Sequence, residues 1–203
     1  MRTRFGSFLP LAAATALLLL LAAAPACAKG AVGETAPAFK LSDATGKTHE
    51  LSDYSGKVVV LEWINPNCPF SARHAREKTM TELARRHGQV VWLAVNSTSD
   101  SHPNYLEPAE HLAWNRDNGI DYAVLYDPKG TVGKAYGAKT TPHMYIVDEQ
   151  GKIVYNGAID DDPSGRKAEA QRANYVGLGL VAQAADRQPD PAATKPYGCS
   201  VKY

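Results

Sequence analysis

Two short apolar runs dominate the hydrophobic pattern of the chain. They cover Val58–Ile64 and Val90–Val95, and Glu62 is the one charged residue in them. Runs of this length, rich in β-branched and aromatic residues, are typical of strands buried on both faces. Between them, Pro69–His87 carries apolar positions at helical spacing and ends before Gly88, a residue that favours a helix stop. The pattern therefore predicts a strand–helix–strand unit with two parallel strands.

The rest of the chain continues the alternation of strands and helices. Further helices are expected at Pro108–Asn118, Thr131–Tyr136 and Arg166–Asp186, and further strands at Tyr122–Tyr126, His143–Val147 and Lys152–Tyr155. The last two strands are joined by a short polar turn and should pair as an antiparallel hairpin. The turn-rich segment Lys29–Lys57 predicts another hairpin before the first buried strand. This order predicts an α/β fold, a three-layer sandwich whose central mixed sheet has helices on both faces and an N-terminal hairpin extension.

The first 28 residues have the pattern of a secretory signal peptide. Arg2 and Arg4 precede an apolar run at Leu9–Ala24, which is followed by small residues typical of a cleavage site. No later stretch approaches the roughly 18 to 20 apolar residues of a membrane span. We therefore expect cleavage after Ala28, a periplasmic or secreted protein, and no stable membrane insertion after cleavage. A second interpretation makes Cys27 a lipid-modified N-terminus, although the residues before it match a lipoprotein signal poorly.

Composition refines this organisation. The sequence predicts a signal peptide at 1–28, a single domain at 29–187, and an extended, proline-rich C-terminal tail at 188–203. Removing Arg2 and Arg4 from the 22 basic residues leaves 20 against 21 acidic residues, and a near-neutral surface argues against nucleic acid as a partner. Cys68 and Cys199 remain in the mature chain, and such a pair forms either a structural disulfide or a redox couple.

Cys68 occupies the position of greatest chemical interest. It follows the first buried strand, and Pro69 after it suits the first position of a helix. A sulfur at a helix N-terminus lies near unpaired N–H groups and the positive end of the helix dipole, which favour the thiolate. The sequence thus indicates a nucleophilic cysteine. The alternative is a buried structural cysteine with no chemical role.

Four motifs extend this interpretation to a family. They occupy Glu62–Phe70, Tyr136–Pro142, Gly157–Asp161 and Gly198–Lys202. In this order they resemble the thioredoxin-fold superfamily, and within it the exported peroxiredoxin-like branch, called redoxin or AhpC/TSA-like. The resemblance covers nearly the whole mature chain and implies a thiol-dependent oxidoreductase without cofactor or metal. Its partners would be protein or low-molecular-weight thiols and disulfides, or hydroperoxides.

The resemblance also implies roles for individual residues. Cys68 would be the redox nucleophile, Cys199 the candidate resolving thiol, and Glu62 a buried acid that relays protons. Pro142 would follow a cis peptide bond and lie against the sulfur. The residues expected to position the substrate are Asn65, Ser71 and Thr141. The alternatives are a water-exposed Glu62, a trans Pro142, and a Cys199 that is a free thiol or part of a static disulfide.

Two departures from the family patterns leave the reaction open. Thioredoxins have a second cysteine where this chain has Ser71, so the local resolving thiol is missing. Typical peroxiredoxins have a proline and a threonine where this chain has Leu61 and Asn65. Thiol–disulfide exchange and peroxide reduction therefore both remain hypotheses, and each takes its second thiol from Cys199 or from another molecule.

Hypotheses of other classes also fit the sequence. Cys68 with His74 and His143 could bind copper or zinc, as in thioredoxin-fold metallochaperones, although two cysteines without close spacing make a thin ligand set. The fold could also serve as a non-catalytic binding module. The acid run Asp160–Asp162 lacks the spacing of a calcium loop and is expected to be a solvated turn.

Overall fold

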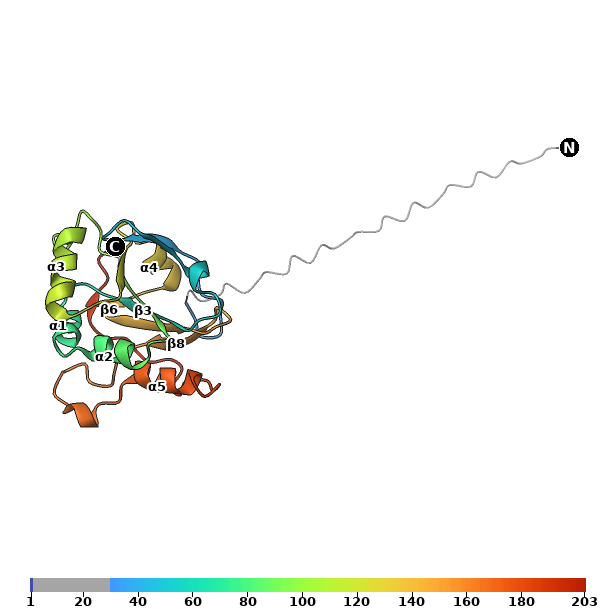
Figure 1. Cartoon of the computed structure of the whole chain (residues 1–203). Coiled ribbons are helices and arrows are strands. Elements are labelled where there is room, and N and C mark those ends of the chain that lie inside the picture. The colour runs from blue at the N-terminus through green and yellow to red at the C-terminus, as the bar shows by residue number, and fades with distance from the viewer. Residues whose placement is uncertain (2–29) are drawn as a thin grey trace.

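The computed structural model describes residue 1 and residues 30–203, and the latter form a sheet enclosed by helices (Figure 1). The segment predicted as a signal peptide, with Cys27 and the cleavage site after Ala28, lies outside the described residues apart from Met1. Within residues 30–203, no helix has the length and apolar character needed to cross a membrane.

Seven strands form the central sheet in the order β2-β1-β5-β4-β3-β7-β8. Their bounds are β1 Lys40–Asp43, β2 Thr48–Glu50, β3 Val59–Trp63, β4 Val91–Asn96, β5 Ala123–Tyr126, β7 His143–Val147 and β8 Ile153–Gly157. The buried strands β3, β4 and β5 are parallel, β7 is antiparallel to β3, and β8 is antiparallel to β7. The predicted N-terminal hairpin is present as β1 and β2, and β1 pairs with the edge of β5. The α/β fold with a mixed sheet is thus confirmed.

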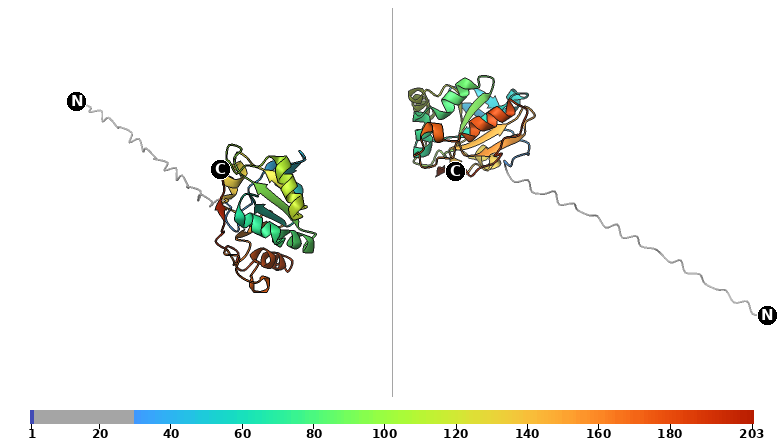
Figure 2. Two further views of the ribbon diagram at one scale, coloured as in Figure 1. Left: turned by 90° about the vertical axis from the view of Figure 1, so that its left-hand side faces the viewer. Right: turned by 90° about the horizontal axis from the view of Figure 1, so that it is seen from below.

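Helices cover both faces of the sheet (Figures 1 and 2). The helices are α1 Pro69–Arg76, α2 Thr79–Arg86, α3 Pro108–Asn118, α4 Thr131–Tyr136 and α5 Tyr175–Gln183, with 3-10 turns η1 Leu51–Tyr54 and η2 Glu169–Gln171. Successive residues of β3 point to opposite faces. Val60 joins the core formed with α2 and α5, whereas Trp63 packs on Tyr136 of α4, with ring centroids 5.1 Å apart. The strand is apolar except at Glu62 because both of its faces are buried.

The single helix predicted over residues 69–87 is wrong in one respect, because it is two helices. Lys78 adopts a left-handed conformation with φ of 55°, and α2 starts at the next residue. The break redirects the chain so that Met80 and Leu83 pack on the sheet. Lysine is a good helix former, so its own propensity gave no sign of this turn.

The helix predicted over residues 166–186 is also shorter than expected. Only α5 and the 3-10 turn η2 form there, because Asp161 and Asp162 draw the preceding backbone into a loop. Asp162 accepts hydrogen bonds from the backbone N–H groups of Arg166 and Lys167, and Asp161 accepts one from Ala173. The Asn174 side chain accepts a hydrogen bond from the Gly177 N–H and so caps the N-terminus of α5. The Asp161 and Asp162 carboxylates thus bind backbone N–H groups that a helix would otherwise use.

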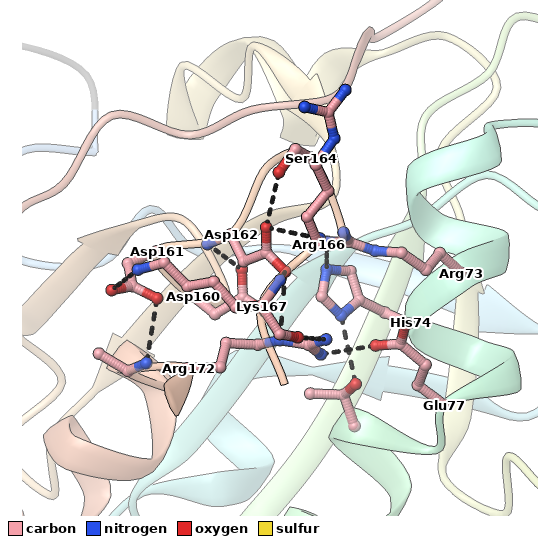
Figure 3. Close-up of polar contacts among 12 residues, drawn as sticks. Arg73, His74, Glu77, Asp160, Asp161, Asp162, Ser164, Arg166, Lys167 and Arg172 are labelled. Atoms are coloured by element: carbon pink, nitrogen blue, oxygen red, sulfur yellow. Dashed lines mark hydrogen bonds and ion pairs between the residues drawn. The ribbon is translucent and has the colours of Figure 1, made fainter. Parts of the chain in front are cut away.

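The three successive aspartates after β8 are not a solvated turn, which corrects the sequence prediction. Asp160 and Asp162 are each only 1% exposed. The Nε atom of Arg172 lies 3.6 Å from a carboxylate oxygen of each, and its guanidinium also donates to Glu77 on the far side at 2.6 Å (Figure 3). Burial of these carboxylates is tolerated because each is paired and hydrogen-bonded.

The C-terminal segment packs along the domain and ends beside α4, where the Tyr203 hydroxyl donates to the Ala138 carbonyl. Residue Asn156 of the edge strand β8 exchanges backbone hydrogen bonds with residues 192 and 194, so this segment covers the edge of the sheet. Further on, β9 Cys199–Ser200 pairs antiparallel with β6 Thr140–Thr141. The tail thus brings Cys199 to the residues that precede Pro142.

Candidate active site

The candidate site begins at the turn between β3 and α1. Cys68 is the N-cap residue of α1, with Pro69 at the first helical position. The Cys68 N–H donates to the carbonyl of Asn65, and the Asn65 side chain accepts from the N–H of Asn67. The Asn65 side-chain amide also donates to Thr98 Oγ1 at 2.6 Å. Asn65 therefore shapes the turn and ties it to the loop after β4.

Cys68 meets a second segment, the Thr141–Pro142 pair, whose peptide bond is cis. The Cys68 thiol donates to the carbonyl oxygen of Thr141 at 2.8 Å across 73 residues of sequence. This contact follows from the sheet, because Trp63 at the end of β3 pairs with His143 at the start of β7. The carboxyl end of one strand and the amino end of its antiparallel neighbour lie at the same end of the sheet.

Cys199 is the third component of the site. It pairs with Thr141 in the β6–β9 ladder, and a hydrogen bond joins its thiol to that of Cys68. Both cysteines are free thiols, and Cys68 is only 2% exposed whereas Cys199 is partly exposed. The structure therefore brings together the two cysteines of residues 30–203.

The two thiols differ in acidity. Burial raises the pKa of Cys68, but hydrogen bonds from the Cys199 thiol, the Thr141 side chain and the Ser71 backbone outweigh burial, so the net pKa lies below its ordinary value. Burial raises the pKa of Cys199 to about 11, and its hydrogen bond to Cys68 and the charge on that sulfur add to the effect. The pair thus ionises at Cys68, with Cys199 as the hydrogen-bond donor to the thiolate.

Ser71 stands where a thioredoxin has its second cysteine. Its backbone N–H donates to the Cys68 sulfur, which is how a helix N-terminus stabilises a thiolate. Its hydroxyl is buried and has no hydrogen-bond partner among the described residues. The contact with Cys68 therefore comes from the backbone of Ser71 and not from its hydroxyl.

Glu62 lies on β3, on the face covered by α1 and α2. It is 3% exposed, and burial raises the pKa of its carboxyl to about 7, partly offset by a hydrogen bond from the Tyr122 hydroxyl at 2.9 Å. A cavity of about 10 Å³ borders it, lined also by His74 and Thr81. The acid is thus buried beneath the helix that carries Cys68 and titrates near neutral pH.

The two histidines considered as metal ligands are engaged in hydrogen bonds. His143 bonds to Asn156 at 2.7 Å and to the Lys139 N–H, and His74 bonds to Tyr197 and Thr79. Burial lowers the pKa of each imidazole to about 4. In the described part of the chain, no three His, Cys, Asp or Glu side chains converge as metal ligands.

Tyr197 is a residue of the site that the sequence did not indicate. Its ring lies against Phe70, with centroids 6.0 Å apart, and its hydroxyl contacts His74 and Asp160. Phe70 and Tyr197 each lie two residues from a cysteine of the pair. A tyrosine in a proline-rich tail carries no local pattern that would reveal such partners.

Gly198 fixes the approach of the tail and allows a direct test. Its φ is 132°, and a Cβ atom there would lie 2.2 Å from the Thr141 carbonyl oxygen. Gly198→Ala should therefore push β9 away from β6 and raise the rate at which bulky maleimides modify Cys68 by roughly tenfold or more. Gly46→Ala, at a glycine of similar positive φ with open space around it, is the control. Equal labelling of both variants and the wild type would contradict a tightly docked tail.

Comparison with known proteins places this geometry in context. Residues 32–156 match the AhpC/TSA family. A thiol-disulfide oxidoreductase, ResA, of Geobacillus thermodenitrificans is 32% identical over 124 residues, which are 61% of this chain and 67% of the relative. A Mycobacterium tuberculosis protein provisionally named a peroxiredoxin is 30% identical over 135 residues, 60% of this chain and 81% of that protein.

The fold has a solved counterpart as well. The crystal structure of an uncharacterised conserved protein from Geobacillus kaustophilus superimposes with a TM-score of 0.74 and 28% sequence identity. The match covers 86% of this chain and 93% of the other. It therefore extends beyond the segment shared with the sequence relatives.

Proposed function

Because this chain belongs to the AhpC/TSA family, we propose that it is a thiol-dependent oxidoreductase in which Cys68 is the nucleophile and Cys199 the resolving thiol. One observation carries the proposal: a hydrogen bond joins the two thiols, and the pKa of Cys68 is lowered while that of Cys199 is raised. A nucleophilic thiolate needs a nearby second thiol to release its mixed disulfide. The names of two relatives, a thiol-disulfide oxidoreductase and a provisional peroxiredoxin, agree with this chemistry.

The proposed reaction has two steps. The Cys68 thiolate attacks one sulfur of a disulfide substrate, the substrate S–S bond breaks, and one substrate thiolate leaves and takes up a proton. Cys199 then loses its proton and attacks the Cys68 sulfur, which expels the second substrate thiol and leaves an intramolecular disulfide. With a hydroperoxide, the first step instead gives a sulfenic acid and an alcohol or water, and condensation with Cys199 releases water. An external dithiol returns the pair to its reduced form.

The remaining site residues support these steps. Glu62, whose pKa of about 7 lets it gain and lose a proton near neutral pH, is proposed as the proton relay. Thr141 and Pro142 hold the carbonyl against the Cys68 sulfur, and Asn65 and Ser71 fix the turn that presents the thiolate. These residues would fix the position of the Cys68 sulfur and thereby that of a substrate bonded to it.

The burial of Cys68 favours small reactants in the first step. The sulfur-bearing residue is 2% exposed beneath the β6–β9 ladder, so a folded polypeptide cannot reach it without displacement of the tail. We propose low-molecular-weight disulfides and hydroperoxides as the first reactants. The proposed location is the periplasm or the exterior, because residues 1–28 have the pattern of a signal peptide.

Thiol trapping with mass spectrometry tests the couple. Reduced protein lacking residues 1–28 is treated with one equivalent of hydrogen peroxide or oxidised glutathione, quenched in acid and alkylated. The expected product contains a Cys68–Cys199 disulfide that a dithiol reductant opens. Persistent glutathionylation or overoxidation of Cys68, with Cys199 alkylated throughout, would refute the resolving role.

A further inference from the structure

The hydroxyl of Tyr197 is held by three side chains. Arg73 donates to it at 3.1 Å, the Nε2 atom of His74 lies 2.9 Å away, and the hydroxyl donates to a carboxylate oxygen of Asp160. The ring packs between Phe70 and the Arg73 guanidinium, the latter 5.9 Å from its centroid. The tail is thereby fastened to helix α1 and to the loop after β8 at one point.

Two residues that contact the Tyr197 hydroxyl, His74 and Asp160, are buried and held by further contacts. His74 and Asp160 are each 1% exposed, and the second nitrogen of His74 bonds to Thr79. Asp160 accepts the N–H of Asp162 and lies 3.6 Å from Arg172. Figure 3 shows these side chains converging between α1 and the loop after β8. Removal of the Tyr197 hydroxyl would take one hydrogen bond from each of these two buried side chains, so the tail has a strongly preferred position.

The chain between Tyr197 and the Cys199 thiol is too short to let the two residues move apart. Gly198 alone separates Tyr197 from Cys199, and two residues span at most about 7 Å. Phe70, which contacts the tyrosine ring, is likewise two residues beyond Cys68 on α1. The anchor therefore connects the backbone beside one cysteine to the backbone beside the other.

We propose that Tyr197 is a positioning residue whose buried hydroxyl holds Cys199 within reach of Cys68. The inference rests on the proposed function, because it concerns the second of its two steps. The Tyr197 hydroxyl touches neither sulfur, so its loss reaches the first attack only indirectly, through the Cys199 hydrogen bond that favours the Cys68 thiolate. The contacts of the hydroxyl raise the effective concentration of the Cys199 thiol near Cys68, because a thiol held in place meets the Cys68 sulfur more often than one on a free tail.

Two-step exchange with oxidised glutathione tests this role. Cys68 attacks the glutathione disulfide and releases one glutathione, and Cys199 then displaces the second. Rapid acid quench and mass spectrometry give both rates in wild type and in Tyr197→Phe, which keeps the ring. We expect a second step about tenfold slower and a smaller change in the first step, so that glutathionylated Cys68 accumulates.

Controls separate positioning from general damage. Tyr126→Phe removes a hydroxyl that donates only weakly, at 3.4 Å, to the Pro108 carbonyl and lies away from the cysteines, and it should leave both rates unchanged. An equal fall in both steps of Tyr197→Phe would show disrupted folding of the site and overturn the positioning role. An unchanged second step would overturn that role alone, with the couple intact. A wild type that never closes its disulfide would overturn both the couple and the role of Tyr197.

Discussion

Cys68→Ser should abolish turnover, whereas Cys199→Ser should complete a single first step and then stop. A serine hydroxyl at the N-terminus of α1 is far too weak an acid to ionise near neutral pH, so the nucleophile is lost. We expect the loss to be at least about a thousandfold in the rate of dithiol-dependent reduction of peroxide or oxidised glutathione. In Cys199→Ser, the product should instead be one equivalent of released substrate thiol for each protein molecule.

The comparison between the two variants is decisive because it separates the roles. A coupled assay with dithiothreitol measures steady turnover, and an acid-quenched assay measures the first equivalent. Cys68→Ser should give neither. Steady turnover by Cys68→Ser would show that another group is the nucleophile. Full steady turnover by Cys199→Ser would show that the second thiol comes from the reductant, and Cys199 would then have no part in catalysis.

Glu62→Gln should make the protein more stable than the wild type at neutral and alkaline pH. Burial raises the pKa of the Glu62 carboxyl from 4.5 to about 7, so the folded protein binds a proton there that the unfolded chain has already released. Between pH 4.5 and 7 the folded state therefore carries more bound protons, and the free energy of unfolding falls as pH rises. The shift corresponds to about 3 kcal/mol by pH 7 and above.

Glutamine fits the same space and can still accept the Tyr122 hydrogen bond, but it carries no titratable proton. The difference in unfolding free energy between Glu62→Gln and wild type should thus grow in favour of the variant from pH 4.5 to 7 and then level off. Urea denaturation at a series of pH values measures it. His74 and His143, whose pKa burial lowers from 6.5 to about 4, also make stability depend on pH in this range, but both proteins contain them and their contributions cancel in the difference. A difference independent of pH would mean that Glu62 ionises normally.

The local predictions that succeeded depend on short-range physical chemistry. The run at residues 58–64 is apolar because β3 is buried on both faces, and Pro69 after Cys68 is compatible with only a few backbone conformations, among them the first turn of a helix. Cys68 at the start of α1 was therefore predictable from fewer than fifteen residues. The pairing of β7 with β8 and the N-terminal hairpin likewise follow from short strand-type segments separated by turn residues.

The predictions that failed depended on competition between local and distant partners. Lys78 breaks a helix that its propensity favours, because the following turn packs Met80 on the sheet. The acids after β8 hold residues 166–173 in a loop where periodicity favoured a helix. The burial of Asp160 also needed Arg172 and Tyr197, which lie well beyond it in the chain. No local pattern reports which charge will neutralise a buried carboxylate.

The sequence by itself determined the α/β class, the family, the place of Cys68 at the start of α1 and the two cysteines from which a couple could be built. The tertiary structure decided how they meet: β3 and β7 bring the carbonyl of Thr141 to the Cys68 sulfur, and the β6–β9 ladder brings Cys199. The physical reason is the separation along the chain of the residues that interact. Strand and helix signals are encoded in neighbouring residues, whereas the acidity of Cys68 and the place of Tyr197 depend on contacts between segments that only the folded chain brings together.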